Sequence, residues 1–401
     1  MSTHAIPEGA PRVPGFDHAT DETLRRDHHR EWDRLRSIAP VFASDIAEDW
    51  TVWYVLSHEE GHRVVSEPET FSSRHVAPHT HVEPHRWIPL ELDPPEHTEY
   101  RHLLNQKFSP AAVAAMESHV RGLARSLVDE LAPRGACDFM ADFARRFPTT
   151  IFMEIFGLPV EEADKFLGWI DQLMHTQHAD DPDGAVRGAA AMTIYGYLGE
   201  LIDDRRSAPR DDLVSYLGAA NVHGEPISAD NLREMCFLLY MAGLDTVAGM
   251  LGYVFLHLAQ NREHRALVGA DERAIPPFVE ECLRAYGIVT TQRVAIRDTV
   301  VGGCPVKKDD RVLVAWGATE RDPVAFEDAD RFVIDRETNR HLNFGAGPHR
   351  CLGSHLARLE LRVAVEEWLR RVPDFRLAAG AELSQHIGGV AGLDNLPLVW
   401  S

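Results

Sequence analysis

The sequence predicts a mainly α-helical fold, in which one large helical domain also carries small antiparallel β-sheets. Apolar side chains recur at helical spacing through long stretches between residues 109 and 286, which indicates amphipathic helices. β-Branched runs are short and lie mainly within residues 40–56 and 294–315. The chain has 401 residues, 44% of them hydrophobic and 26% charged, and shows no internal repeat and no linker. We therefore expect residues 1–401 to form a single domain.

The charge balance argues against some classes of partner. The chain has 41 Lys and Arg against 62 Asp and Glu, a net charge of −21, so no basic excess is present to neutralise nucleic acid or anionic lipid. The five cysteines are an odd number and form no CxxC pair, which favours a reducing cytoplasm over a disulfide framework. Residues 1–16 contain no apolar run, so we expect neither a signal peptide nor a membrane anchor.

The first 135 residues contain three kinds of segment. Residues 1–35 are expected to be loosely ordered and to become helical around residues 31–36. Two β-like runs follow at residues 40–42 and 51–56, separated by an acidic turn. Residues 109–132 form the clearest helix, because Ser109 can cap it, Pro110 suits its first turn and Gly135 follows its end.

Helices dominate the rest of the chain. The β-branched runs 294–296, 299–301 and 311–315 interrupt them and, joined by turns at residues 302–303 and 308–310, predict a small antiparallel sheet. Helices are expected at residues 139–156, 160–177, 184–207, 213–220, 228–261, 263–270, 276–286 and 352–371.

The most apolar stretch, residues 236–259, is long enough to span a bilayer. Asp245 lies in its middle, however, and a central Asp costs roughly 2.5–3.5 kcal/mol on insertion scales. A helix that is apolar all round is also typical of the centre of a large soluble protein. We adopt that interpretation, which makes Asp245 and Thr246 two polar groups inside a core.

A loop of sequence FGAGPHRCLG spans residues 344–353 and ends at a predicted helix. The partial positive charge of a helix N-terminus favours the thiolate of Cys351, the form that binds metals, and glycines let the backbone approach a flat group. The residues alone leave alternatives open. Cys351 could be a buried structural cysteine, a zinc ligand with His349 and His355, or a nucleophile whose base the sequence does not locate.

This loop resembles the haem-binding loop of the cytochrome P450 family, of the form Phe-x-x-Gly-x-x-x-Cys-x-Gly. The resemblance implies that Cys351 is the axial thiolate ligand of haem b. It implies further that haem contacts come from Phe344, Gly345, His349 and Gly353.

Three further motifs in chain order resemble the same family. Glu281 and Arg284 match its Glu-x-x-Arg pair, with Arg331 as the partner further on, a structural lock. Residues 242–246 match its oxygen-binding helix. The segment 93–97, followed by Arg101, matches its propionate-binding segment. The implied cofactor-binding residues are His97, Arg101, Arg293, His349, Ala242 and Gly243.

From about residue 40 onward the chain resembles the camphor-hydroxylase branch of the family. This implies a soluble monomer that receives electrons from NADH through a flavin reductase and a [2Fe-2S] ferredoxin. It also implies a small apolar terpenoid or norisoprenoid ketone, camphor-like or ionone-like, as substrate. His85 replaces a ketone-binding Tyr, and the implied pocket comprises His85, Trp87, Leu90, Leu238, Met241, Val289 and Val390.

The resemblance also implies a mechanism, hydroxylation of an unactivated C–H bond with O2. Thr246 would hold a water by hydrogen bonds, Asp245 would relay protons and Gly243 would leave room for O2. Two alternatives stay open: a peroxide-driven peroxygenase and a haem sensor without enzymatic activity. His75, His79, His81 and His85 could form a metal site, although a solvated loop that is rich in histidine is favoured.

Overall fold

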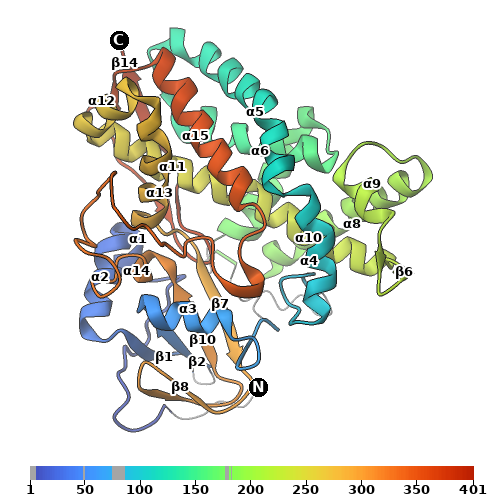
Figure 1. The fold of residues 1–401 in the computed structure, drawn as a ribbon, viewed down its shortest axis with the longest axis vertical. Helices are drawn as coiled ribbons and strands as arrows, with labels where there is room; N and C mark the ends of the chain where they lie inside the picture. Colours follow the sequence, from blue (N-terminus) through green and yellow to red (C-terminus); the bar gives the residue numbers. More distant parts are fainter. Residues whose placement is uncertain (1–5, 48–49, 75–85, 177–179, 182) are drawn as a thin grey trace. The chain divides into compact units, whose positions relative to one another are not determined.

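The computed structural model describes residues 6–47, 50–74, 86–176, 180–181 and 183–401. The chain divides into two compact units, each assembled from separate stretches of sequence (Figure 1). Unit one comprises residues 1–78, 270–351 and 383–394, and unit two comprises residues 79–269, 352–382 and 395–401. The expectation of a single domain stays a prediction.

Unit one contains a five-stranded sheet with the order β1-β2-β10-β7-β3. Strand β2 pairs with β10 in parallel and every other pair in this sheet is antiparallel, so two strand groups that the sequence keeps apart share one sheet. A separate hairpin of β8 and β9 turns at Gly302 and Gly303, both at positive φ. The strands of unit one are β1 (Val41–Ala47), β2 (Trp50–Val55), β3 (Phe71–Ser72), β7 (Thr290–Ala295), β8 (Thr299–Val301), β9 (Cys304–Val306), β10 (Arg311–Ala315), β12 (Gln385–His386) and β13 (Gly392–Leu393).

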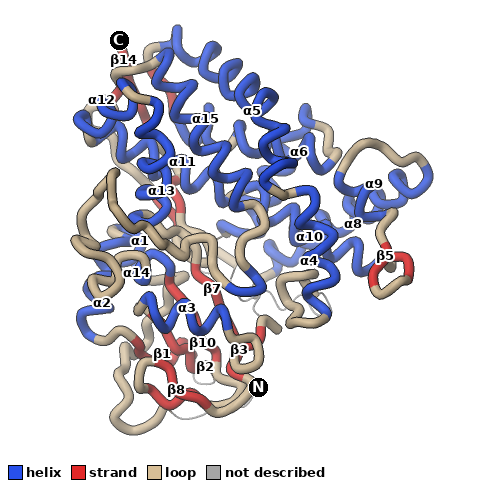
Figure 2. The backbone as a smooth tube through the Cα atoms, in the orientation of Figure 1, coloured by secondary structure: helices blue, strands red, loops and turns tan. Residues whose placement is uncertain are grey.

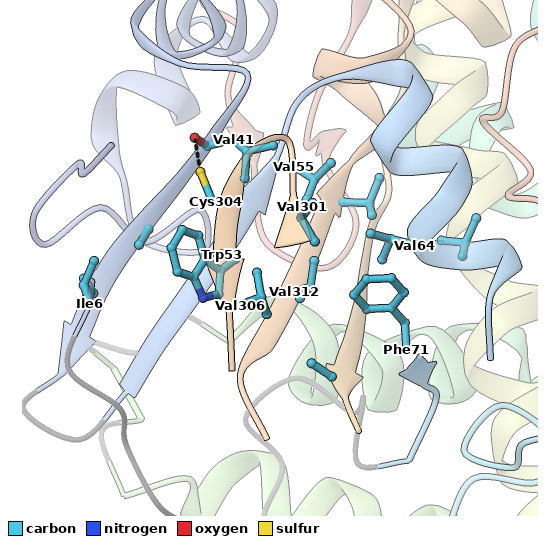
Figure 3. Close-up of a cluster of buried hydrophobic side chains, with 14 of the residues drawn as sticks. Ile6, Val41, Trp53, Val55, Val64, Phe71, Val301, Cys304, Val306 and Val312 are labelled. Atoms are coloured by element: carbon cyan, nitrogen blue, oxygen red, sulfur yellow. Dashed lines mark hydrogen bonds between the residues drawn. The ribbon is translucent and has the colours of Figure 1, made fainter. Parts of the chain in front are cut away.

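The core of unit one is made by β-branched and aromatic side chains of these strands together with helix α3 (His58–Ser66) (Figure 3). Trp53 is fully buried there and satisfies its indole N–H by donating to Asp310 at 2.9 Å. The Cys304 thiol donates to the backbone oxygen of Val41 at 3.8 Å. Leu342 and Ala346, which flank Phe344 in the cysteine loop, pack against this core and thereby anchor the loop.

The prediction of a loosely ordered start is wrong for residues 6–35. Helices α1 (Glu22–Arg26) and α2 (His28–Ile38) occupy its second half. Phe16 and Trp32 are buried, with ring centroids 5.7 Å apart, and Tyr54 of β2 lies 5.0 Å from Phe16. Burial of these aromatic rings orders the segment, although its local sequence is polar.

Four short or medium-length helices of unit one follow α3 along the chain, before or after its strands. Gly287 and Gly317 approach so closely that a Cβ on either would lie 2.7 Å from backbone atoms of the other. These helices are η5 (Glu272–Ala274), α13 (Ile275–Ala285), α14 (Trp316–Thr319) and the single turn η6 (Gly347–His349).

Unit two is mainly helical, with two small antiparallel sheets (Figure 2). Its strands are β4 (Ala136–Asp138), β5 (Asn221–Val222), β6 (Glu225–Pro226), β11 (Phe375–Leu377) and β14 (Pro397–Trp400). Its helices are α4 (Glu96–Lys107), α5 (Pro110–Leu131), η1 (Ala132–Arg134), η2 (Met140–Ala144), α6 (Arg146–Phe156), η3 (Val160–Glu162), α7 (Ala163–Ile170), η4 (Asp171–His175), α8 (Ala185–Ser207), α9 (Leu213–Gly218), α10 (Ala229–Leu244), α11 (Thr246–Gln260), α12 (Arg262–Ala270) and α15 (Ser354–Arg371).

Helices α5 and α15 lie side by side in unit two (Figure 1). The predicted cap is confirmed, since Ser109 accepts from the N–H of Ala112 at 3.3 Å. Between the two helices, the buried carboxylate of Glu367 accepts from Arg121 at 3.0 Å, Arg125 at 3.4 Å and Arg371 at 2.8 Å. Arg370 also donates to this carboxylate, at 2.5 Å, so four arginines compensate one buried carboxylate.

The predicted helix at residues 228–261 is instead two helices, α10 and α11, which meet at Asp245 with φ −120° and ψ −43°. The Thr246 hydroxyl donates to the backbone oxygen of Ala242 at 3.3 Å, a local bond that competes with the helical backbone bond. By length and composition Ala229–Gln260 could cross a membrane, but 67% of its most apolar window is buried inside the structure. This burial agrees with the interpretation as a core helix.

Candidate active site

The cysteine loop of unit one is fixed by backbone hydrogen bonds. The N–H of Cys351 donates to the oxygen of Phe344 at 2.7 Å, and the N–H of Gly345 donates to the oxygen of Leu342 at 2.6 Å. Gly345 has φ +67°, which a glycine adopts without strain. Cys351 itself is exposed, whereas Cys236, Cys282 and Cys304 are buried. The loop therefore presents a thiol, which argues against the interpretation as a buried structural cysteine.

Helices α3 and α13 contact the cysteine loop and the residues just before it. Gly347, at φ +65°, passes so close to α3 that a Cβ would lie 2.7 Å from the backbone oxygen of Val65. On the other side, His341 Nε2 lies 2.9 Å from the carboxylate of Glu280 on α13. Gly347 is thus required by close packing of backbone on backbone.

A buried ion cluster lies on the same helix α13. Glu281 and Arg284 are fully buried and form a bidentate pair at 2.8 and 2.9 Å. Arg284 also donates to the backbone oxygens of Glu320, Ala329 and Arg331. Burial by itself raises the pKa of Glu281. Hydrogen bonds from Arg284 and Arg336 outweigh burial and hold this pKa below its usual value.

The prediction that Arg331 supplies the third charge of this cluster is wrong. Its side chain is 70% exposed and pairs with Asp328 at 3.0 Å, so only its backbone oxygen belongs to the cluster. The guanidinium of Arg336 takes the expected place, 3.2 Å from Glu281 and 8% exposed. The turn that begins at Asp328 directs residue 331 to solvent and returns residue 336 to the carboxylate.

The other predicted residues of unit one lie on its strands and loops. Arg293 on β7 is buried and donates to the backbone oxygen of Gln292 at 2.7 Å. His349 is half-buried in η6. Val289 and Val390, both half-buried, form an isolated antiparallel bridge, so the structure brings these two predicted substrate residues together.

In unit two, helix α10 presents one poorly covered face. Leu238 is half-buried, Ala242 is exposed and Thr246 is half-buried, and these residues follow one another at intervals of four. Met241, also predicted to face substrate, is 7% exposed. Ala242 is thus an exposed apolar residue next to the buried Met241, and an apolar helix face of this kind suits contact with a flat cofactor.

The predicted role of Gly243 in leaving room for O2 stays a prediction, and the structure adds a packing role for this glycine. A Cβ at this position would lie 2.2 Å from Cδ2 of Phe152 on α6. The position that a side chain would take is therefore filled by an aromatic ring, and the glycine permits close packing of α10 on α6.

Asp245, at the break between α10 and α11, is paired with His175 at the end of η4. Its Oδ1 lies 3.1 Å from His175 Nε2, and both side chains are 14% exposed. Burial lowers the pKa of His175, but the hydrogen bond and the charge of Asp245 outweigh burial and leave this pKa above its usual value. The pair therefore favours an imidazolium beside a carboxylate.

The remaining predicted residues of unit two are placed as follows. His97 is buried on the first turn of α4, and Arg101, four residues later on the same face, donates to Asn105 at 2.9 Å. Trp87 is buried with its ring 6.3 Å from that of Phe237, and Leu90 is half-buried. Gly353 is the N-cap of α15, with open space where a Cβ would be. His85 and the other histidines of the loop at 75–85 lie outside the described residues.

The donor set fits a haem. Unit one offers an exposed thiol on a rigid loop, together with the buried cation Arg293. Unit two offers the uncovered stripe of Leu238, Ala242 and Thr246 and the pair of His97 and Arg101. Within unit one, a single soft ligand together with a cation for a carboxylate matches the chemistry of a haem better than that of a zinc ion, which needs several protein ligands.

Comparisons with known proteins agree with this chemistry. The model of the family "Cytochrome P450" matches residues 45–271 and 275–377. The probable cytochrome P450 127A1 of Sinorhizobium fredii is 34% identical, with 90% of this chain and 87% of that protein covered. The mycinamicin IV hydroxylase/epoxidase of Micromonospora griseorubida is also 34% identical, with 97% and 99% covered. Among solved structures, CYP101J2 has a TM-score of 0.86 at 32% identity and CYP101C1 has 0.87 at 31%; coverage is 100% of both chains for the first, and 99% and 100% for the second.

The chain belongs to the cytochrome P450 family and is a haem-thiolate monooxygenase with haem b as its cofactor. The predicted family, its likeness to the camphor-hydroxylase branch and the mainly helical fold with small antiparallel sheets are confirmed.

Three contributors to the site were missed from the sequence. His175 lies 70 residues from Asp245, and a lone histidine in a polar segment carries no signal of pairing. Phe152 is one of several aromatic residues of α6. Arg336 is one of several arginines after residue 330, and only the observed turn distinguishes it from Arg331.

Proposed function

We propose that this monooxygenase hydroxylates an unactivated C–H bond of a small apolar terpenoid or norisoprenoid ketone with O2. Two electrons come from NADH through a flavin reductase and a [2Fe-2S] ferredoxin. The single observation that supports O2 as oxidant is the break at Asp245, where an acid held by His175 adjoins the hydroxyl of Thr246. Peroxide-driven turnover needs no such pair for proton delivery.

Cys351 is proposed as the axial ligand. The N–H of Cys351 donates to the backbone oxygen of Phe344, and this bond fixes the backbone that carries the thiol. The haem, when bound, supplies O2 activation, which an axial thiolate favours. The residues proposed to bind its carboxylates, the arginines as cations and the histidines as N–H donors, are His97 and Arg101 in unit two and Arg293 and His349 in unit one.

Thr246 and Asp245 are proposed to manage protons. The Thr246 hydroxyl donates to Ala242, which leaves its oxygen lone pairs able to accept from a water. Asp245 can take a proton from solvent after its contact with His175 loosens, and can pass it toward that water. His175 thereby positions the acid and sets its charge.

The substrate proposal is supported by the apolar character of the predicted substrate residues in each unit taken by itself. Trp87, Leu238 and Met241 in unit two, and Val289 with Val390 in unit one, contribute apolar surface. CYP101J2, CYP101C1 and, at 32% identity, the cytochrome P450-terp of Pseudomonas are similar to this chain. His85 is proposed to donate a hydrogen bond to the ketone.

The proposal is tested by reconstitution of the haem-loaded chain with NADH, a reductase and a [2Fe-2S] ferredoxin. A panel of terpenoids and norisoprenoids is first screened by the spin-state change of the haem. A hydroxylated product formed in proportion to NADH supports the proposal. Product formed with hydrogen peroxide but not with the reductase and ferredoxin identifies a peroxygenase, and a spin-state change without product under either condition identifies a binding protein. We further propose a monomer in the cytoplasm, which sedimentation and cell fractionation test.

A further inference from the structure

Glu280 on α13 precedes the buried Glu281, and the proposed function gives it no role. Its Oε2 lies 2.9 Å from Nε2 of His341, which stands three residues before the cysteine loop. The side chain of His341 is 3% exposed and that of Glu280 is 32% exposed. A hydrogen bond from a buried imidazole to a carboxylate is charge-assisted, so it is stronger than a bond between two neutral groups.

The hydrogen bonds of His341 define which of its ring nitrogens carries the proton. The backbone N–H of Asn343 donates to His341 Nδ1 at 3.3 Å, so Nδ1 acts as an acceptor and carries no proton. The proton of the neutral ring is then on Nε2, which donates to Glu280. In the other tautomer, or in the imidazolium, an N–H of the ring would face the N–H of Asn343. The two bonds therefore support the same tautomer.

The ring of His341 is also linked to Cys351. Asn343, whose N–H the ring accepts, is followed by Phe344, and the rings of Phe344 and His341 have centroids 6.1 Å apart. The backbone oxygen of Phe344 accepts from the N–H of Cys351 at 2.7 Å. A displacement of the His341 ring would therefore move the residue that fixes the backbone of Cys351.

The neighbouring Glu281 is directed to a different partner. Adjacent residues of an α-helix point about 100° apart. The carboxylate of Glu281 accepts from Arg284 at 2.8 Å and from Arg336 at 3.2 Å, within the buried ion cluster. Two successive glutamates of α13 thus hold two different points of the segment that leads into the cysteine loop, and only Glu280 bonds the point next to the loop, His341, among the described residues.

We propose that Glu280 and His341 are positioning residues of the cysteine loop, which hold Cys351 where its thiolate can bind the haem iron. The carboxylate keeps the ring proton on Nε2, and Nδ1 keeps the N–H of Asn343. The bond between Phe344 and Cys351 then stays aligned. Groups that orient a metal ligand typically contribute about 10–100-fold to metal affinity or activity. Because Cys351 is the proposed ligand, this inference rests on the proposed function.

The test is the spectrum of the reduced carbon-monoxide complex of the haem-loaded chain at pH 7. It is read as the ratio of the long-wavelength Soret band, which reports an axial thiolate, to the shorter-wavelength band that replaces it when the thiolate is lost. Glu280→Leu removes the acceptor at a partly exposed position and should lower this ratio about tenfold. His341→Phe keeps an aromatic ring without nitrogens and should lower the ratio at least as much. Glu280→Gln keeps an oxygen that accepts from Nε2 and should retain most of the wild-type ratio.

A double variant distinguishes an effect through His341 from an independent effect of Glu280. If Glu280 acts through His341, adding Glu280→Leu to His341→Phe should change the ratio no further. If His341→Phe does not load haem, the comparison of Glu280→Leu with Glu280→Gln decides. His62→Phe on α3 and Glu337→Leu change exposed residues of unit one and should keep the wild-type ratio.

Three results would overturn the inference. The first is an equal ratio in the wild type, Glu280→Leu and His341→Phe. The second is a loss in the double variant that multiplies the two single losses. The third is a loss in Glu280→Gln as large as that in Glu280→Leu, or an equal loss in His62→Phe.

The inference and the proposed function fail differently. Absence of the long-wavelength band in the wild-type chain contradicts Cys351 as the ligand itself. A band that is present in the wild type and insensitive to Glu280 and His341 contradicts only the positioning role of this pair.

Discussion

His175 Nε2 and Asp245 Oδ1 lie 3.1 Å apart, with η4 supplying the histidine and the break between α10 and α11 supplying the acid. This pair places a titratable cation beside the acid proposed to relay protons. The pKa of His175 is raised by its bond with Asp245, so stabilisation by the pair is present below the ordinary histidine pKa and is lost as the pH rises through the higher pKa of the folded protein.

We therefore expect the pH dependence of turnover to change in His175→Asn. The wild-type turnover number should show a transition above pH 6.5, where His175 loses its proton, and the variant should lack it. Thr176→Val is the matched control, because among the described residues its hydroxyl bonds only the backbone oxygen of Gln172. An unchanged pH profile in His175→Asn would show that the histidine does not set the charge of Asp245.

Asp245→Asn should slow turnover at every pH, since the relay acid is removed while its shape is kept.

Thr246→Ala should uncouple NADH oxidation from product. The variant keeps the apolar face of α10 and should still bind substrate, but protons arrive without productive use and oxygen leaves as hydrogen peroxide. Product and peroxide per NADH are measured together. Thr193→Ala on α8 removes a hydroxyl with the same local bond, to Ala189 at 2.9 Å, and should stay coupled. Equal product per NADH in Thr246→Ala and the wild type would remove this role from Thr246.

Gly243→Ala should destabilise the packing of α10 on α6, because the new methyl group meets the ring of Phe152. The expected cost is about 1–3 kcal/mol in the free energy of unfolding, measured in urea. Phe152→Leu in the same chain should recover part of that loss, since the smaller side chain vacates the position. If Gly243→Ala is neutral in stability and instead blocks O2 binding, the glycine serves oxygen access after all.

The carboxylate of Glu367 should make unit two sensitive to acid. Burial alone raises its pKa, but hydrogen bonds from Arg121, Arg125 and Arg371 lower it to about 2. A lowered pKa stabilises the folded state above the ordinary value of 4.5, and this stabilisation is lost as the pH falls from 4.5 to 2.

Glu367→Gln should therefore lower the free energy of unfolding at pH 7 and flatten its dependence on pH below 4.5. The exposed Glu200→Gln on α8 is the control and should leave both unchanged. Retention of the wild-type acid dependence in Glu367→Gln would assign that dependence to other carboxylates.

Much of the fold follows from local sequence signals. The capped helix α5 and the hairpin at Gly302 are encoded by neighbouring residues, so their positions were predicted closely. The order of residues 6–35 was not predicted. It depends on burial of Phe16 against Trp32 and Tyr54, and Tyr54 comes from a strand further along the chain. The parallel pairing of β10 with β2 likewise joins segments some 260 residues apart, which spacing along the chain does not reveal.

The candidate site divides in the same way. Short motifs contain Cys351, Thr246 and the pair of Glu281 and Arg284. Such motifs can be recognised from neighbouring residues in the sequence alone. Arg336 pairs with Glu281 in place of Arg331 because of the path of a single turn. His175 pairs with Asp245 because η4 ends beside that acid. Gly243 shows a further limit, since the sequence indicates that a side chain is missing but not which neighbour fills the space.

The most direct test of the account is the spectrum of the reduced carbon-monoxide complex of the haem-loaded chain at pH 7, compared with Cys351→Ser and with Cys137→Ser, a half-buried cysteine of unit two. An axial thiolate gives a long-wavelength Soret band, and an alcohol cannot replace it as an anionic donor. We predict that the band and NADH-coupled hydroxylation are present in the wild type and Cys137→Ser and absent in Cys351→Ser. Retention of both by Cys351→Ser would contradict the assignment of Cys351 as the haem ligand.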